Sequence, residues 1–171
     1  AAGVGVAHCP SSNLILASGI APVVDLARAG ARVGLGVDGS SSADSASLWL
    51  EARQAMLLAK LRSGASAADA RLALRMATVG GAGCLGREGE LGVLAPGAVA
   101  DLAIWDLTGV QFAGAISDPI EAWLRCGPTF ARDTIVAGRA VVRDGRLVSG
   151  KLDEMLTWHG KVAAAMQAPL G

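Results

Sequence analysis

The sequence has little of what disulfide frameworks and metal centres are usually built from. It contains no tyrosine, two histidines and three cysteines among 171 residues. The cysteines, Cys9, Cys84 and Cys126, are odd in number and show no paired spacing, which argues against a disulfide framework or a zinc knuckle. We expect them to be small buried residues of a protein that works in a reducing compartment, the cytoplasm.

An excess of charge and long apolar runs are also lacking. Fifteen basic and fifteen acidic residues give a formal net charge of zero, so the electrostatic signature of nucleic-acid binding is missing. No apolar run is long enough to span a membrane, and no basic-then-apolar signal opens the chain. Since 52% of the residues are hydrophobic, the composition predicts a large buried core without nucleic-acid or membrane partners.

The first half of the chain carries the pattern of an α/β unit. Short apolar strands are predicted over 3–7 and 32–37, with a helix over 22–30 between them. Strands joined in this way are expected to lie parallel to each other. The polar run 8–13 follows the first strand and contains a proline, so it predicts a loop.

A long helix is predicted to follow, beginning at a cap formed by Asp44 or Ser45 and ending near Leu61. Glu51 is expected to point away from the packed face of this helix. That packed face is predicted to consist of Leu48, Ala52, Ala55, Met56 and Ala59.

Two further helices are predicted over 66–78, capped by Ser66, and over 77–85. The character then changes to β structure, with antiparallel strands turning near Gly138 and near Asp144. Short and long helices are expected over 118–125 and 152–167.

One segment, Arg32–Gly39, offers a functional argument. Its apolar strand residues end at Asp38, and the polar run Ser40–Ser42 follows. A carboxylate at the C-terminal end of a buried strand is where α/β enzymes place chemistry, although the same position suits a helix cap. The serines could bind phosphate, but no glycine-rich cradle or lysine accompanies them, so a solvated loop is favoured.

Several blocks, in this order, resemble the amidohydrolase superfamily. They are Val6–Leu14, Gly19–Pro22 and Val33–Gly39, followed by Ala77–Gly86, Gly89–Leu102 and Val136–Gly145. The closest branch is the ATZ/TRZ group of aminohydrolases and deaminases. The resemblance implies an α/β fold in which 1–86 are the last strands and helices of a (β/α)8 TIM barrel. It also implies that 87–150 form the C-terminal portion of a small β-sandwich and 151–171 a C-terminal helix.

The resemblance also implies roles for individual residues. Asp38 matches the acid that binds Zn2+, or another divalent metal such as Fe2+, and that moves a proton from the metal-bound water to the leaving amine. His8 lies in the loop after the seventh barrel strand and is a candidate for substrate binding. Asn13 is expected to order that loop, and Trp123 and Cys126 are candidates for the mouth of the pocket.

The implied activity is hydrolytic deamination of a purine-type ring, 8-oxoguanine or guanine, with release of ammonia. The alternatives are a triazine or S-adenosylhomocysteine-type aminohydrolase, and a non-catalytic interaction chain. The family's His-x-His pair and other histidine ligands have no counterparts, because His8 and His159 are the only histidines. We therefore expect the C-terminal part of a longer enzyme, or one subunit of a split enzyme, that forms homo-oligomers. The missing barrel segment or another chain should cover residues 1–37.

Overall fold

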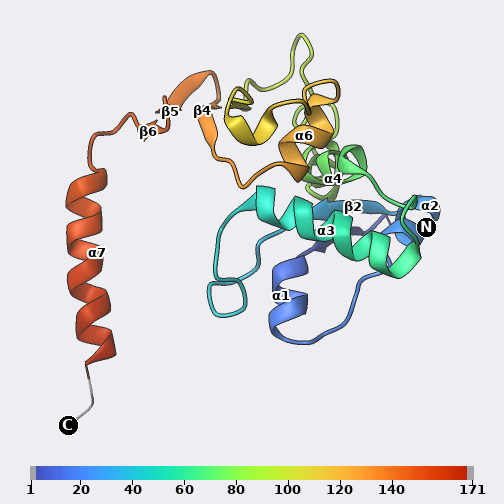
Figure 1. Cartoon of the computed structure of the whole chain (residues 1–171), viewed down its shortest axis with the longest axis horizontal. Coiled ribbons are helices and arrows are strands. Elements are labelled where there is room, and N and C mark those ends of the chain that lie inside the picture. The colour runs from blue at the N-terminus through green and yellow to red at the C-terminus, as the bar shows by residue number, and fades with distance from the viewer. Residues whose placement is uncertain (1–2, 169–171) are drawn as a thin grey trace. The chain divides into compact units, whose positions relative to one another are not determined.

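The computed structural model describes residues 3–168 and contains two compact units (Figure 1). The first comprises the chain up to Val99 together with Asp106–Thr129, and the second comprises Ala100–Trp105 together with the chain from Phe130 onward. No helix within 3–168 is long and apolar enough to cross a membrane. The α/β class is confirmed, whereas the boundaries 1–86, 87–150 and 151–171 stay a prediction.

The first unit combines two parallel strands with a series of helices. Its elements are β1 (Gly5–His8), α1 (Pro10–Ile15), α2 (Val23–Arg28), β2 (Arg32–Leu35), α3 (Leu48–Ser63), α4 (Ala70–Arg75), the π-helix η1 (Met76–Gly80), α5 (Gly81–Cys84), the 3-10 helix η2 (Val110–Phe112) and α6 (Pro119–Arg125). The two strands pair in parallel with Val6 beside Val33, as the strand–helix–strand spacing predicts.

The core of this unit lies where α2, α3 and η1 pack against β2. It is formed by the buried residues Val23, Val24, Val33, Ala55, Ala59, Ala68 and Met76. Small residues permit very close packing: a Cβ added to Gly80 would lie 2.1 Å from the carbonyl oxygen of Val33. The backbone of η1 therefore rests directly on the backbone of β2.

The starts of α1, α3 and α4 differ from the sequence-based expectations. The run 8–13 is not a loop, because α1 begins at Pro10, whose missing N–H is harmless in a first helical turn. The cap of α3 is Ser47, whose hydroxyl accepts a hydrogen bond from the Leu50 N–H, not Asp44 or Ser45. Likewise Asp69, not Ser66, caps α4.

The packed face of α3 also differs from the prediction at two positions. Ala52, Ala55, Met56 and Ala59 are buried as expected. Leu48, however, is 40% exposed, and Trp49 is buried beside it. Glu51 was expected to point outward, yet its exposed fraction is 0%.

The second unit contains a four-stranded antiparallel sheet in the order β3-β4-β5-β6. Its strands are β3 (Leu102–Trp105), β4 (Ala131–Val136), β5 (Arg139–Arg143) and β6 (Arg146–Leu147), and the helix α7 (Leu152–Gln167) follows. Both predicted turns are confirmed, since Gly138 and Asp144 have positive φ angles of 78° and 49°. Asp101 accepts a hydrogen bond from the Ala137 N–H at 2.7 Å. No residue of α7 is buried, including His159.

Candidate active site

Asp38 lies three residues beyond the end of β2, in a tight loop. Its φ angle is +59°, in the left-handed region that non-glycine residues rarely adopt. The carbonyl of the next residue, Gly39, accepts hydrogen bonds from the N–H groups of Ser42 and Ala43. Such unfavourable backbone conformations persist only when the surroundings fix them, and they are concentrated at functional sites.

The Asp38 carboxylate is hydrogen-bonded to two serine side chains but not neutralised. Ser12 Oγ donates to Oδ2 at 2.6 Å, and Ser42 Oγ donates to the same oxygen at 3.1 Å. The Ser12 hydrogen bond, then the Gly39 backbone and Ser42, lower the pKa of Asp38. Among residues 3–168, no cation pairs with this carboxylate and no side chain donates to Oδ1. Asp38 is therefore ionised at neutral pH, and neither serine occupies its second oxygen, Oδ1.

The loop serines were favoured as a solvated segment, but Ser42 is buried and contributes directly to this arrangement. Ser12 was not singled out at all, although it lies within the block that carried the family resemblance. Asn13 was expected to order the run 8–13. Its side chain makes no hydrogen bond within the described residues, whereas the hydroxyl of its neighbour Ser12 donates to Asp38.

Ser12 is positioned by the contact between α1 and α3. The N–H of the preceding residue, Ser11, donates to Glu51 Oε2 at 2.9 Å. The Ser11 hydroxyl donates to Gln54 Oε1, one turn further along α3, at 2.8 Å. Because Pro10, Ser11 and Ser12 are all buried, the first turn of α1 is fixed against α3.

His8 and Cys9 lie at the end of β1 and directly after it. His8 is 4% exposed, and burial lowers its pKa, so the imidazole is neutral at neutral pH. Burial also raises the pKa of the Cys9 thiol, and the charges of Asp38 and Glu51 raise it further. Cys9 is therefore a protonated thiol, which is a poor nucleophile. Whether His8 contacts a substrate stays a prediction.

The two pocket candidates on or after α6 are held close to α3. Trp123 is buried, and its carbonyl oxygen accepts a hydrogen bond from Trp49 Nε1 at 2.9 Å. Cys126 is a free, partly buried thiol directly after the helix. Arg53 of α3 donates to the last carbonyl groups of α6, those of Leu124 and Arg125, at 3.0 and 3.1 Å.

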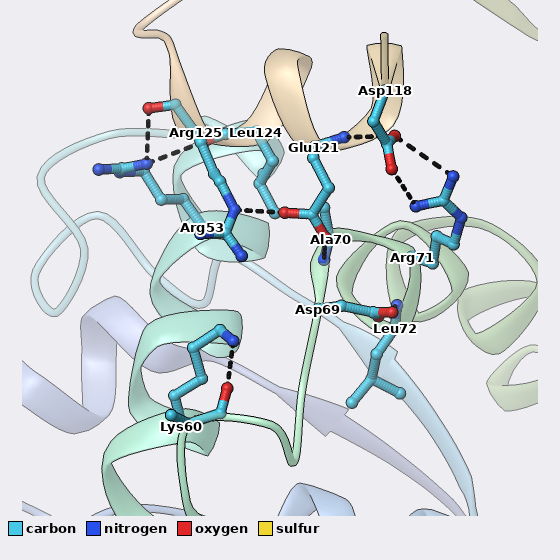
Figure 2. A network of polar contacts seen from close by, with 11 residues as sticks. Arg53, Lys60, Asp69, Ala70, Arg71, Leu72, Asp118, Glu121, Leu124 and Arg125 are labelled. Carbon is cyan, nitrogen blue, oxygen red and sulfur yellow. Dashed lines mark hydrogen bonds and ion pairs between the residues drawn. The ribbon is translucent and has the colours of Figure 1, made fainter. Parts of the chain in front are cut away.

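Figure 2 shows these contacts together with a second set at the start of α6. Asp118 caps the helix by accepting the Glu121 N–H, and its two oxygens also accept from Arg71 of α4. Glu121 accepts the Ala70 N–H at the start of α4 and pairs with Arg125. The helix that carries Trp123 is thus attached to both α3 and α4.

The residues present fit a metal site only in part. A carboxylate oxygen such as Asp38 Oδ1 is a suitable donor for a divalent ion. No group of three or more His, Cys, Asp or Glu residues gathers within 3–168 to hold a metal ion. A catalytic zinc ion takes about three protein ligands, so the described residues do not complete such a site.

A carboxylate just beyond the C-terminal end of a parallel strand is where (β/α)8 barrel enzymes place catalytic residues. Residues 1–148 match the amidohydrolase family. The chain belongs to the amidohydrolase family.

Two relatives that are similar in sequence to this chain have different deaminase activities. The chain is 47% identical over 167 residues to the 8-oxoguanine deaminase of Pseudomonas aeruginosa, covering 98% of this chain and 37% of that protein. It is 40% identical over 148 residues to a 5-methylthioadenosine/S-adenosylhomocysteine deaminase of Desulforudis audaxviator, covering 86% of this chain and 34% of that protein. The chain therefore spans little more than a third of the length of these relatives.

The chain is also similar to solved structures of zinc-bound enzymes. The chain is similar to the zinc complex of the atrazine chlorohydrolase of Arthrobacter aurescens TC1, with a TM-score of 0.85 and 35% identity over 94% of this chain and 36% of that one. It is also similar to a zinc-bound adenosine deaminase of Xanthomonas campestris, with a TM-score of 0.79 and 32% identity over 95% of this chain and 38% of that one.

Proposed function

We propose that this chain is the C-terminal part of a metal-dependent aminohydrolase that deaminates a purine-type ring, 8-oxoguanine or guanine, and releases ammonia. The observation that carries the proposal is the Asp38 carboxylate, which is ionised, is held through Oδ2 by two serine hydroxyls and has no cation paired with it within 3–168. The similarity to the 8-oxoguanine deaminase of Pseudomonas aeruginosa favours this substrate class.

The proposal includes a larger assembly. Residues 1–86 would be the last strands and helices of a (β/α)8 barrel, residues 87–150 part of a β-sandwich and 151–171 a C-terminal helix. The remaining barrel strands, from a further segment or another chain, would cover residues 1–37 and supply the other metal ligands. Two features support this: within residues 3–168, β1 and β2 form a sheet of two strands, and Val4, directly before β1, is 70% exposed. The complete enzyme would be a cytoplasmic homo-oligomer.

In this proposal Asp38 contributes one oxygen to a Zn2+ or Fe2+ ion, which when bound would make a water molecule acidic enough to attack at neutral pH. Ser12 and Ser42 keep the other oxygen in place. The Asp38 carboxylate would accept a proton from the attacking water, whose oxygen forms a bond to the ring carbon while the electron pair of the carbon–nitrogen double bond moves onto the ring nitrogen. The bond to the exocyclic amine then breaks, and this amine leaves as ammonia with the proton that Asp38 carried. The carbon–oxygen double bond forms at the same time, and the remaining proton of the water ends on the ring nitrogen. His8, neutral and buried, is available as a hydrogen-bonding group for the ring.

A triazine or an S-adenosylhomocysteine-type substrate is the alternative. It is favoured by the structural similarity to the atrazine chlorohydrolase and by the sequence similarity to the Desulforudis deaminase. Both substrates require the same chemistry at the same carboxylate, so the alternatives differ in the pocket rather than in the role of Asp38.

The test uses the complete zinc-loaded enzyme and measures ammonia release from 8-oxoguanine, guanine, S-adenosylhomocysteine and an amino-substituted triazine. We expect the two purines to react fastest and about one catalytic zinc ion to be bound per site. Faster release from one of the other two substrates would favour the alternative. No ammonia release from any substrate, in a folded protein that retains no metal, would show a non-catalytic chain and overturn the proposal.

A further inference from the structure

Glu51 is a fully buried acidic residue that the proposed chemistry does not use. It lies on α3, and its exposed fraction is 0%. Within residues 3–168, its only hydrogen bond is the one that Oε2 accepts from the Ser11 N–H at 2.9 Å, and Oε1 is buried without a hydrogen-bond partner. Any hydrogen-bonded influence of this carboxylate on the site therefore passes through α1.

The Ser11 N–H is one that α1 cannot satisfy by itself. The first N–H groups of a helix have no intrahelical acceptor and normally receive one from the side chain of the N-cap residue. Here the N-cap, Cys9, makes no such hydrogen bond. Glu51, forty residues further along the chain, supplies the acceptor in its place. Since α1 has only six residues, it is too short to be stable without such external contacts.

The next residue of the same turn, Ser12, donates to Asp38 Oδ2 at 2.6 Å. A continuous path therefore runs from Glu51 through the Ser11 backbone to Ser12 and then to Asp38. Gln54 supports the same turn, but it contacts the Ser11 side chain and not the backbone.

We propose that Glu51 is a positioning residue for the reaction: it fixes the first turn of α1 so that the Ser12 hydroxyl orients the Asp38 carboxylate. This inference rests on the proposed function of Asp38. Glu51 would thus affect the geometry at Asp38, in addition to its contribution to the packing of α3.

The test compares variants of the complete zinc-loaded enzyme. Glu51→Met keeps a similar volume but removes the acceptor, and we expect kcat to fall about tenfold with little change in KM, the effect of misplacing one hydrogen bond to a charged group. Glu51→Gln retains a carbonyl acceptor for the Ser11 N–H and should recover kcat to within about threefold of the wild type. Gln54→Met is the matched control on the same helix face, and we expect a smaller effect.

A double-mutant cycle separates positioning from general destabilisation. If Glu51 acts through Ser12, then Glu51→Met combined with Ser12→Ala should be no more than about twofold slower than Ser12→Ala alone, because coupled residues are not additive. Two readouts do not depend on turnover. In Glu51→Met, the amides of 11–13 should exchange hydrogen faster, and a chelator should remove zinc sooner.

An unchanged kcat in Glu51→Met would overturn the inference. It would also be overturned if Glu51→Met and Glu51→Gln lowered kcat equally and if the loss in Glu51→Met added fully to the loss in Ser12→Ala. If Glu51→Met does not fold, Glu51→Asp, which withdraws the acceptor by one methylene, replaces it with the same expectations. A wild-type enzyme that neither binds zinc nor releases ammonia overturns the proposed function and this role together. An active wild type with an unaffected Glu51→Met enzyme overturns this role alone.

Discussion

Two aspartates of the first unit have the same chemistry and different uses. Asp118 caps α6, and its two oxygens accept hydrogen bonds from the Arg71 guanidinium at 2.8 and 3.2 Å (Figure 2). Asp38 receives both of its side-chain hydrogen bonds on one oxygen, from uncharged serines, and it has a left-handed backbone. Both oxygens of Asp118 are thus bound by a cationic side chain, whereas both side-chain donors to Asp38 are uncharged and share one oxygen.

The pKa values alone would not separate these two acids. Arg71 lowers the pKa of Asp118, and Ser12 lowers that of Asp38. Both carboxylates are therefore charged at neutral pH. The difference lies in what remains available: Asp118 is paired with a cation, and Asp38 has no cation within the described part of the chain. A charged acid that is oriented but unpaired is the one suited to bind a metal ion or accept a proton.

The largest expected effect comes from exchanging each acid for its amide. Asp38→Asn keeps the size of the side chain but removes its charge and its ability to accept a proton, so turnover of the complete enzyme should fall at least about a hundredfold. Its melting temperature should change little. Asp118→Asn retains a good capping residue and loses the pairing with Arg71, so it should lower the melting temperature slightly and leave turnover within about twofold. Near-normal turnover in Asp38→Asn, with a lower melting temperature, would show that both acids are structural.

The second prediction concerns the packing of η1 against β2, the strand that precedes Asp38. In Gly80→Ala, the new methyl group would lie 2.1 Å from the Val33 carbonyl oxygen, a distance that only backbone movement can relieve. We expect a loss of about 3 kcal/mol or more in the free energy of unfolding, measured by urea denaturation. Gly81→Ala is the matched control, because its nearest neighbour would be an ordinary 3.8 Å away. Similar stabilities for the two variants would contradict this close packing.

The sequence predicts the elements whose signals are local. The Asp118–Pro119 pair marks the start of α6, and the last helix runs from Leu152 to Gln167 as expected. The start of α3 was misplaced because several residues between Asp44 and Ser47 suit a helix cap equally well. Trp49, which packs on the segment after α6, is buried where Leu48 was expected, and such a choice depends on contacts distant in sequence.

The candidate site was predictable in its centre and not in its surroundings. Asp38 stands out because an acid follows an apolar strand and because the neighbouring blocks resemble a known family. The roles of Ser12, Ser42 and Glu51 depend on contacts across 26, 4 and 40 residues. Glu51 was expected to face outward, yet it is fully buried and accepts a hydrogen bond from the first turn of α1, a contact that the local sequence does not reveal.

A third, smaller effect should distinguish the α6 contacts from the Asp38 contacts. Glu121→Ala leaves the Ala70 N–H without its acceptor and removes the pair with Arg125, so the free energy of unfolding should fall by about 1–2 kcal/mol. Turnover should stay within about twofold. Glu121→Gln keeps an acceptor for Ala70 and should lose less stability. A fall in turnover as large as that in Asp38→Asn would mean that the α6 contacts belong to the reacting site.

The smallest expected effect is the pH dependence due to His8. Burial lowers its pKa below the ordinary value of 6.5, so the unfolded chain binds a proton at a higher pH than the folded protein does. By linkage, this contribution to stability is complete above about pH 6.5 and is lost as the pH falls through the folded pKa. The carboxylates Asp38, Asp118 and Asp133, whose pKa values are lowered, titrate below this window.

The melting temperature of the complete enzyme should thus drop by no more than about 3 °C between pH 7.5 and 5.5, and His8→Gln should reduce that drop. His159→Gln, at an exposed position of α7, serves as the control. A melting temperature that rises on acidification, or a drop that His8→Gln leaves intact, would show that a group other than His8 controls stability in this range.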